Sequence, residues 1–247
     1  ELNRISAGYG KQTVLDGISV DFEKGKLTSI IGVNGCGKST LLKAILGILS
    51  LSSGEIFIDG ENLLTISRNE IAKKIAYLSQ GKNIPDMTVE QMVLHGRFPY
   101  LSYPRRYSSH DREVAIKAME IVGVAEFAHK PLYSLSGGMR QNAYIAMALA
   151  QDTDYILLDE PTTYLDIAHQ LELMRILRKL ADSGKGIVTV MHNLPIAFDF
   201  SDKLTVMSNG KIIAYGTPSE ICESHIVEDI FGVKIKQVQK GKYLYEY

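Results

Sequence analysis

The stretch GVNGCGKST, residues 32–40, decides the fold. It matches the G-x-x-x-x-G-K-[S/T] pattern of a phosphate-binding loop. The run LTSII before it predicts a buried strand, and the apolar spacing of residues 39–49 after it predicts a helix. Strand, glycine loop and helix in this order form the setting that the pattern requires, which makes a plain glycine turn the weaker interpretation. The stretch therefore predicts a nucleotide-binding α/β domain.

The residue types of this loop suit phosphate chemistry. Glycines let backbone N–H groups close around phosphate oxygens, and the following helix adds its positive N-terminal end. Lys38 can place a cation between the β- and γ-phosphates, and Ser39 can ligate Mg²⁺. Cys36 could act as a redox switch, but we interpret it as a small spacer. We expect nucleotide contacts from Gly32, Asn34, Gly35, Cys36, Gly37, Lys38, Ser39 and Thr40.

The composition is that of a globular protein with a sizeable core. Of 247 residues, 45% are hydrophobic and 22% are charged, which excludes a disordered or collagen-like chain. Lys and Arg total 27 against 28 for Asp and Glu, so a nucleic acid is not the expected partner. Two cysteines, Cys36 and Cys222, favour a reducing compartment. We expect neither a signal peptide nor a membrane span, because no apolar run approaches ~18–20 residues.

Short apolar runs alternate with longer amphipathic stretches, as is typical of an α/β domain. Prolines punctuate helical patterns between residues 84 and 151, which predicts a helical insert. The expected division is a nucleotide-binding core at 1–83 and 152–233, a helical subdomain at 84–151 and a C-terminal tail at 234–247. We interpret the tail as solvated. Further strands are expected at 2–5, 13–15, 18–22, 55–60, 75–79, 155–158, 186–191 and 203–208, and helices at 114–122, 141–151 and 169–181.

The segment YILLDE, residues 155–160, is an apolar strand that ends in two acids. In an open α/β sheet, such a strand delivers its acids beside the phosphate loop. Asp159 suits the shell of Mg²⁺, directly or through water. Glu160 can accept a proton from the attacking water or orient it. Solvated acids at a strand end are the alternative, which the phosphate loop elsewhere in the chain disfavours.

Two further side chains follow predicted strands. His192 comes after GIVTVM, and we interpret it as a γ-phosphate sensor that also positions Glu160. Gln80 comes after residues 75–79 and before the helical insert. It could contact Mg²⁺ or the attacking water and report the nucleotide state to that insert. Without the other motifs, we would interpret each of these two residues as structural. The phosphate loop and the strand-end acids in the same chain favour a functional role.

A second anion site is predicted from LSGGM, residues 135–139. Ser136 is a natural helix N-cap, and the two glycines expose backbone N–H groups. One chain with two phosphate sites resembles the ATP-binding cassette ATPases, in which ATP lies between the phosphate loop of one subunit and the signature motif of its partner. The resemblance covers essentially the whole chain. It implies a P-loop NTPase (RecA-like) core sheet with an antiparallel β part and an inserted α-helical subdomain.

The resemblance assigns a role to each motif. Tyr9 looks like the aromatic that stacks on adenine, and Asp166, in YLD, like the D-loop aspartate. It further implies that Gln80 is the Q-loop glutamine, that His192 is the switch histidine, and that the signature and the Walker B pair are formed by Ser136, Gly137, Gly138, Asp159 and Glu160. Two positions depart from the family pattern, with effects expected on dimer contacts and turnover: Met139, where Gln or Glu is usual, and Asn142, in place of a common Arg.

Two runs point to a branch of this family. LLDEPTTYLDIAHQ (157–170) and HGRFPY (95–100) resemble the ferric-siderophore import ATPases, which are similar to those for haem and cobalamin. The resemblance implies an ATPase that uses ATP and Mg²⁺ to power uptake of an iron(III)-siderophore-type chelate, at the cytoplasmic face of the membrane. The implied partners are a second copy in an ATP-sandwich homodimer, two membrane permease subunits docked around 84–92 and 98–107, and indirectly an extracytoplasmic binding protein.

Other functions stay open at this point. The chain could serve an importer of haem, cobalamin or another substrate, or an exporter. It could also be a soluble cassette ATPase of cluster assembly, DNA repair or translation. A hypothesis from a different functional class is an adaptor that senses nucleotide but scarcely hydrolyses ATP. The presence of Glu160 and His192 argues against it.

Overall fold

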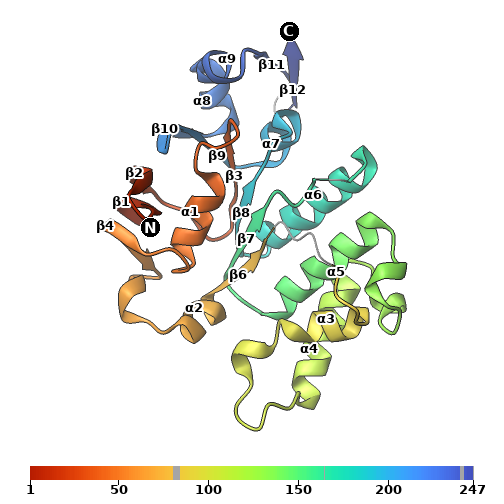
Figure 1. Ribbon diagram of the computed structural model, residues 1–247. Helices are drawn as coiled ribbons and strands as arrows, with labels where there is room; N and C mark the ends of the chain where they lie inside the picture. The colour runs from red at the N-terminus through yellow and green to blue at the C-terminus, as the bar shows by residue number, and fades with distance from the viewer. Residues whose placement is uncertain (80–83, 164, 240–241, 247) are drawn as a thin grey trace.

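Figure 1 shows the computed structural model, which describes residues 1–79, 84–163, 165–239 and 242–246. In this part of the chain, the central layer is a six-stranded sheet of order β10-β9-β3-β8-β7-β6. All neighbouring pairs in it are parallel except β10 and β9, which are antiparallel. The strands are β3 (Leu27–Gly32), β6 (Ile75–Leu78), β7 (Tyr155–Asp159), β8 (Gly186–Val190), β9 (Lys203–Ser208) and β10 (Lys211–Gly216).

The central strands are buried on both faces, and alternate side chains enter different cores. Ile30 of β3 and Leu157 of β7 face one core, whereas Ile31 and Leu158 face the other. The first core also receives α1 (Lys38–Ile45). The second receives the long helix α6 (Ile167–Asp182), together with α7 (Leu194–Phe200) and the helices of the insert. The sheet is thus held between two hydrophobic layers.

A second sheet is antiparallel, with the order β2-β1-β4-β5. Together with α1 and the central sheet it encloses the first core. The three expected short strands near the N-terminus were wrong in their extent, because two long strands replace them. Gly17, at φ 63°, lies where the pairing of β1 with β2 shifts register, so the strand continues through a bulge. The strands are β1 (Leu2–Tyr9), β2 (Gln12–Val20), β4 (Leu51–Ile58) and β5 (Glu61–Asn62).

Residues 84–151 contain three α-helices that pack on one another and lie to one side of the two sheets in Figure 1. They are joined by a buried ion pair in which Arg97 Nε lies 2.9 Å from Asp111 Oδ1. The same guanidinium donates to the carbonyl of Ala150 over 3.0 Å. One side chain therefore ties the region after α3 to both other helices. The helices are α3 (Val89–His95), α4 (Ser109–Ile121) and α5 (Gly137–Ala150), and α2 (Arg68–Lys74) precedes β6.

The last part of the chain differs from the expected solvated tail. After α8 (Pro218–Glu223) and α9 (Ile226–Phe231), the strands β11 (Lys234–Gln239) and β12 (Lys242–Glu246) form a hairpin. Ile235 and Tyr243 are buried, and the Tyr243 ring lies 5.1 Å from that of Phe198 in α7. The sequence did not predict this half-buried hairpin, because its buried apolar residues are single positions among lysines and other polar residues.

Several helix boundaries also differ from expectation, and two of them show the reason. α1 ends at Ile45 rather than at residue 49, because Gly47 adopts φ 65° just beyond it. α5 begins at Gly137, four residues before the apolar pattern starts. In both cases the backbone geometry at a glycine or a cap, and not the apolar spacing, sets the end of the helix.

Candidate functional site

The candidate site lies where three neighbouring strands of the central sheet end. Ile30 of β3 is opposite Val190 of β8, which in turn is opposite Asp159 of β7. Because parallel strands end at the same edge of a sheet, the segments that follow them converge there. These segments are the phosphate loop, the residue Glu160 and the loop that carries His192. The topology therefore brings together three motifs that lie far apart in the sequence.

The phosphate loop has a backbone that only glycine suits at key points. Gly35 and Gly37 adopt φ values of 78° and 107°, and Gly37 directly precedes the first residue of α1. A Cβ atom on Gly32 would lie 2.4 Å from the carbonyl oxygen of Met207 and 2.7 Å from Cys36 Sγ. The loop thus packs tightly between β9 and its own thiol. Cys36 is buried in the core, which fits a packing role.

Lys38 is the buried cation of this loop, with an exposed fraction of 5%. Its Nζ donates to the carbonyl of Gly32 over 2.8 Å and to that of Val33 over 3.0 Å. The ammonium group is therefore held over the loop by backbone carbonyls. A phosphate in the loop would meet a positioned positive charge next to the N-terminus of α1.

Asp159 joins the end of β7 to the phosphate loop. Ser39 Oγ donates to Asp159 Oδ1 over 3.1 Å, and the Tyr77 hydroxyl donates to Oδ2 over 3.4 Å. Burial raises the pKa of Asp159, the bond from Ser39 lowers it, and the charge of Glu160 raises it again. Burial and Asp159 together raise the pKa of Tyr77 to about 12, so its hydroxyl remains a donor at neutral pH. Tyr77 was missed in the sequence, where only its place on β6 could have indicated it.

Glu160 and His192 meet at this edge of the sheet. His192 Nε2 lies 2.5 Å from Glu160 Oε1, a strong contact between an imidazole and a carboxylate. Glu160 adopts φ 52°, a left-handed conformation that is uncommon for a residue with a side chain. Thr163 Oγ1 donates to Glu160 Oε2 over 3.3 Å. The carboxylate is thus oriented by a turn, a hydroxyl and an imidazole.

The glycines at 137 and 138 have different surroundings. Ser136 is the N-cap of α5 as predicted, since its hydroxyl accepts from Met139 N over 3.3 Å. Ser136 and Gly137 are exposed, and a Cβ on Gly137 would meet open space. A Cβ on Gly138 would lie 2.2 Å from the ring of His169, so the start of α5 packs closely on α6.

The α6 end of this contact is built by Asp166. Its carboxylate caps the helix by accepting from His169 N over 2.9 Å, and His169 Nδ1 lies 2.8 Å from the same carboxylate. These hydrogen bonds lower the pKa of Asp166, which is exposed. The signature helix and the D-loop aspartate therefore share the His169 ring as a neighbour, a contact that the sequence did not indicate.

The two departures from the family pattern have defined places. Asn142 Nδ2 donates to the carbonyl of Val122 over 3.1 Å, at the end of α4. Met139 packs partly buried against the second core. Both residues thus connect the signature helix to the helical region that carries it.

Other expected site residues are less constrained. Tyr9 is half exposed at the end of β1, and Asn34 is exposed in the phosphate loop, while Thr40 in α1 is partly buried. Gln80, expected at the metal and the attacking water, lies outside the described residues, as does Tyr164 of the D-loop. Among the described residues, no cluster of three or more His, Cys, Asp or Glu side chains could hold a metal ion by itself.

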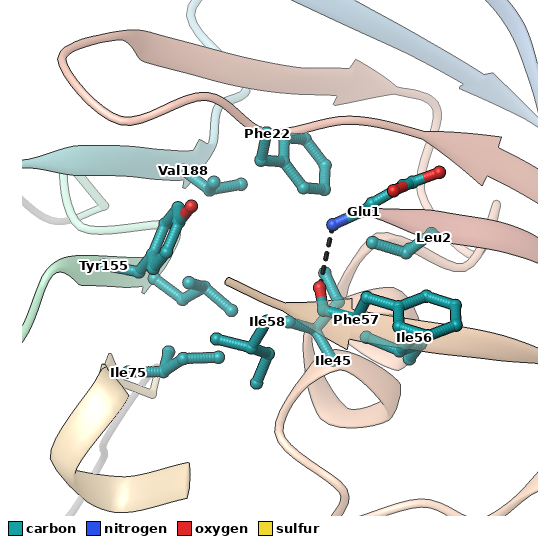
Figure 2. A pocket seen from close by; sticks show the side chains of 11 residues that line it. Glu1, Leu2, Phe22, Ile45, Ile56, Phe57, Ile58, Ile75, Tyr155 and Val188 are labelled. Carbon is teal, nitrogen blue, oxygen red and sulfur yellow. Dashed lines mark hydrogen bonds between the residues drawn. The ribbon is translucent and has the colours of Figure 1, made fainter. Parts of the chain in front are cut away.

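Figure 2 shows a pocket that lies elsewhere, between the antiparallel sheet, α1 and the central sheet. Its volume is small, about 30 Å³. Its walls are mostly apolar, and the N-terminal amine of Glu1 donates to the carbonyl of Phe57 at its side, over 2.9 Å. Such a space is a packing void where three layers meet, and it contains none of the expected site residues.

The geometry agrees with comparisons to known proteins. The family model described as ABC transporter matches residues 15–163. The petrobactin import ATP-binding protein of Bacillus anthracis is 40% identical over 233 residues, which are 94% of this chain and 85% of that protein. The ferric enterobactin transport ATP-binding protein of Escherichia coli is also 40% identical, over 94% of this chain and 86% of that protein.

Solved structures show the same fold. An ATP-binding cassette of an ABC transporter in its ADP conformation superimposes with a TM-score of 0.84 at 26% identity, over 93% of this chain and 96% of that one. An inward-facing transporter described as metal-chelate type gives 0.83 at 27% identity, over 99% and 94%. These matches confirm the predicted P-loop NTPase fold with its antiparallel β part and helical subdomain.

No helix within the described residues has the length and apolar character to cross a bilayer. One edge of the sheet carries a phosphate loop, two acids at a strand end and a histidine paired with one of these acids. This arrangement is typical of a subunit that hydrolyses ATP. The family match spans 149 of the 247 residues, counted from 15 to 163. The chain therefore belongs to the ABC transporter family, in which it is an ATPase coupled to transport.

Proposed function

We propose that the chain powers uptake of an iron(III)-siderophore-type chelate. The observation that carries this proposal is its similarity, over more than nine tenths of its length, to proteins named for import of petrobactin, ferric enterobactin and iron(3+)-hydroxamate. Two of these names specify a ferric substrate, and a further relative is named for siderophore transport. The shared class, rather than any one of them, is what the similarity supports.

The site residues would act on ATP in distinct ways. Backbone N–H groups of the phosphate loop would hold the β- and γ-phosphates, with Lys38 as the positioned cation. Glu160 would orient the attacking water and accept its proton. His192, bonded to Glu160, would sense the γ-phosphate and hold the carboxylate in place. Tyr9 would stack on adenine from the end of β1.

The residues around Asp159 fit a magnesium ion. Mg²⁺ prefers oxygen ligands and takes one or two protein groups together with phosphate oxygens and water. Ser39 Oγ and the Asp159 carboxylate already lie 3.1 Å apart, so a hydroxyl and a carboxylate oxygen are at hand. We place the ion with these two residues and with Gln80. When bound, Mg²⁺ supplies positive charge to the phosphate oxygens.

A second copy of the chain would complete each ATP site. Ser136 and Gly137 present a capped helix start to solvent, while Gly138 beside them is buried against the ring of His169. In a two-fold dimer, each copy would offer this surface to ATP bound by the other, with the Asp166 loop beside it. Closure would exclude water and assemble the catalytic set, so hydrolysis would depend on dimerisation.

The helical subdomain, which we place at residues 84–151, offers a groove to the membrane permeases. The groove has a volume of about 570 Å³ and is lined by residues of both apolar and charged character, namely Asp86, Met87, Glu90, Gln91, Leu94, His95, Tyr107 and Arg112. A permease helix with an apolar face and basic flanks would suit it. The chain would thus sit at the cytoplasmic face of the membrane, with an extracytoplasmic binding protein as an indirect partner.

Uptake measurements test this proposal. Cells that lack the protein would receive the wild type or Glu160→Gln, and uptake of labelled ferric siderophores, haem and cobalamin would be followed. We expect uptake of a ferric siderophore to return with the wild type alone. Restoration of only haem or cobalamin uptake would overturn the substrate class, and dependence of no ligand on the protein would overturn the import role.

A further inference from the structure

The carboxamide of Gln170, in the first turn of α6, links two loops of the site. Its Nε2 donates to the carbonyl of Leu165 over 2.9 Å and to that of Thr162 over 3.4 Å. Its Oε1 accepts from Asn193 Nδ2 over 3.3 Å. Since carbonyl oxygens can only accept, the nitrogen must face Leu165 and Thr162, and the oxygen must then face Asn193. A neutral amide suits this position, because it donates to the two carbonyls with its nitrogen and accepts from Asn193 with its oxygen.

Asn193 carries the link to the switch histidine. It is the N-cap of α7, where its Oδ1 accepts from Ile196 N over 3.3 Å. That bond turns Nδ2 toward Gln170 and fixes the residue directly after His192. The position of the imidazole on Glu160 therefore depends on how Asn193 is held.

The other end of the link returns to Glu160. Leu165 N donates to the carbonyl of Thr162, and Thr163 N donates to that of Glu160, each over 3.2 Å. Thr163 Oγ1 also bonds the Glu160 carboxylate. The turn after Glu160, Gln170, Asn193 and His192 thus form a closed ring of hydrogen bonds and covalent links that begins and ends at Glu160.

We infer that Gln170 is a positioning residue, which holds the His192 loop and the turn before Asp166 in a fixed relation to Glu160. The inference rests on the roles proposed above for Glu160 and His192. Gln170 is partly buried and on α6, so it does not need to touch ATP to act. Movement of the Asp166 turn, which would face a second copy, would reach the histidine through this amide. A displacement of about 1 Å in a catalytic group can lower turnover on the order of 100-fold.

Two variants interrupt the link at different points. Gln170→Met keeps the length of the side chain and removes all three hydrogen bonds. Asn193→Ser keeps a good N-cap for α7 and removes only the donor to Gln170. Gln237→Met, at an exposed position of β11, is the matched control, because its amide oxygen also accepts a single hydrogen bond.

The experiment measures ATP hydrolysis by the full chain over a range of Mg²⁺-ATP concentrations up to saturation, with thermal unfolding as a check on folding. Each variant is expected to lower kcat by on the order of tenfold while leaving KM for ATP within about twofold, because the phosphate loop is untouched. The double variant is expected to lose no more than the worse single variant, because both interrupt one link. The control should match the wild type.

A normal kcat in both single variants, or losses that multiply in the double variant, would overturn the inference. If Gln170→Met does not fold, Asn193→Ser decides alone, since normal kcat in that variant would refute the link. Glu160→Gln is measured alongside. If it is inactive while the Gln170 variants are normal, only this inference fails, whereas an active Glu160→Gln would remove the proposed catalytic role as well.

Discussion

The phosphate loop and the start of α5 both present helix N-termini, but they are embedded very differently. In the phosphate loop, Lys38 is buried and bonded to loop carbonyls, and Ser39 is bonded to Asp159 on a neighbouring strand. At the start of α5, Ser136 and Gly137 are exposed, and the hydroxyl of Ser136 caps its own helix. The first site is assembled within one chain, whereas the second is a surface directed outward. The difference supports the proposal that a second copy of the chain completes each ATP site.

Replacing the carboxylate that works beside the phosphate loop should have the largest effect. Glu160→Gln is expected to lower ATP turnover by about 10²–10⁴-fold, because the amide cannot accept a proton from water. ATP affinity should remain, since the loop contacts are unchanged. Steady-state hydrolysis and nucleotide titration measure the two quantities. Glu172→Gln, an exposed change on α6, is the control, and turnover of Glu160→Gln near that of the control would contradict the role.

Removing the buried ion pair of the helical subdomain should have the next largest effect, a loss of stability. Burial raises the pKa of Asp111, yet hydrogen bonds from Ser108 and Arg97 hold it at about 2, so the group is charged at neutral pH. Arg97→Ala would leave this buried carboxylate without its cation and cost about 3–5 kcal/mol of unfolding free energy. Thermal and urea unfolding measure the loss. Arg105→Ala, which removes only a contact with the Phe98 ring, should cost far less.

Weakening the phosphate loop should reduce nucleotide affinity in the isolated chain. Lys38→Ala removes a charge-assisted contact worth about 1.5–3 kcal/mol, or roughly 10–150-fold in the Kd for ATP. Isothermal titration of the chain at low concentration gives this Kd directly. Lys117→Ala, at an exposed position of α4, removes a positive charge outside the loop and serves as control. Equal affinities for the two variants would show that Lys38 does not hold phosphate.

The two glycines of the signature offer the finest contrast. Gly138→Ala forces a Cβ against the ring of His169, and overpacking of this kind costs about 1–3 kcal/mol. Gly137→Ala places its Cβ in open space, so the isolated chain should keep or gain stability. Chemical unfolding compares the two. Equal destabilisation would mean that α5 and α6 are not packed as described.

The sequence predicted the α/β fold, the phosphate loop and the acids of β7, because each is written as a continuous local pattern. It could not predict partners that depend on three-dimensional placement. The bond from Tyr77 to Asp159, the ring of His169 on Gly138 and the bridge from Gln170 to Asn193 all join segments from different elements. The left-handed turn at Glu160 was equally hidden, since its side chain gives no hint of a positive φ.

The C-terminal hairpin is another element that the sequence did not predict. Its lysines suggest solvent, yet Asp199 accepts from Tyr243 N over 3.2 Å, and Ile235 and Tyr243 pack into the second core. Only two of its positions need to be apolar to anchor it. A pattern so sparse has little periodicity to read, so the sequence analysis described a tail where the chain adds a packed layer.

Sedimentation velocity of the Glu160→Gln chain with ATP tests most directly whether the outward signature surface serves a second copy. The chain should sediment as a dimer with ATP and as a monomer with ADP, because only the γ-phosphate bridges the two surfaces. Adding Ser136→Arg should leave ATP binding intact and keep the chain monomeric, while Ser183→Arg, at the far end of α6, should still allow the dimer. An ATP-dependent dimer that persists with Ser136→Arg would contradict the two-copy site.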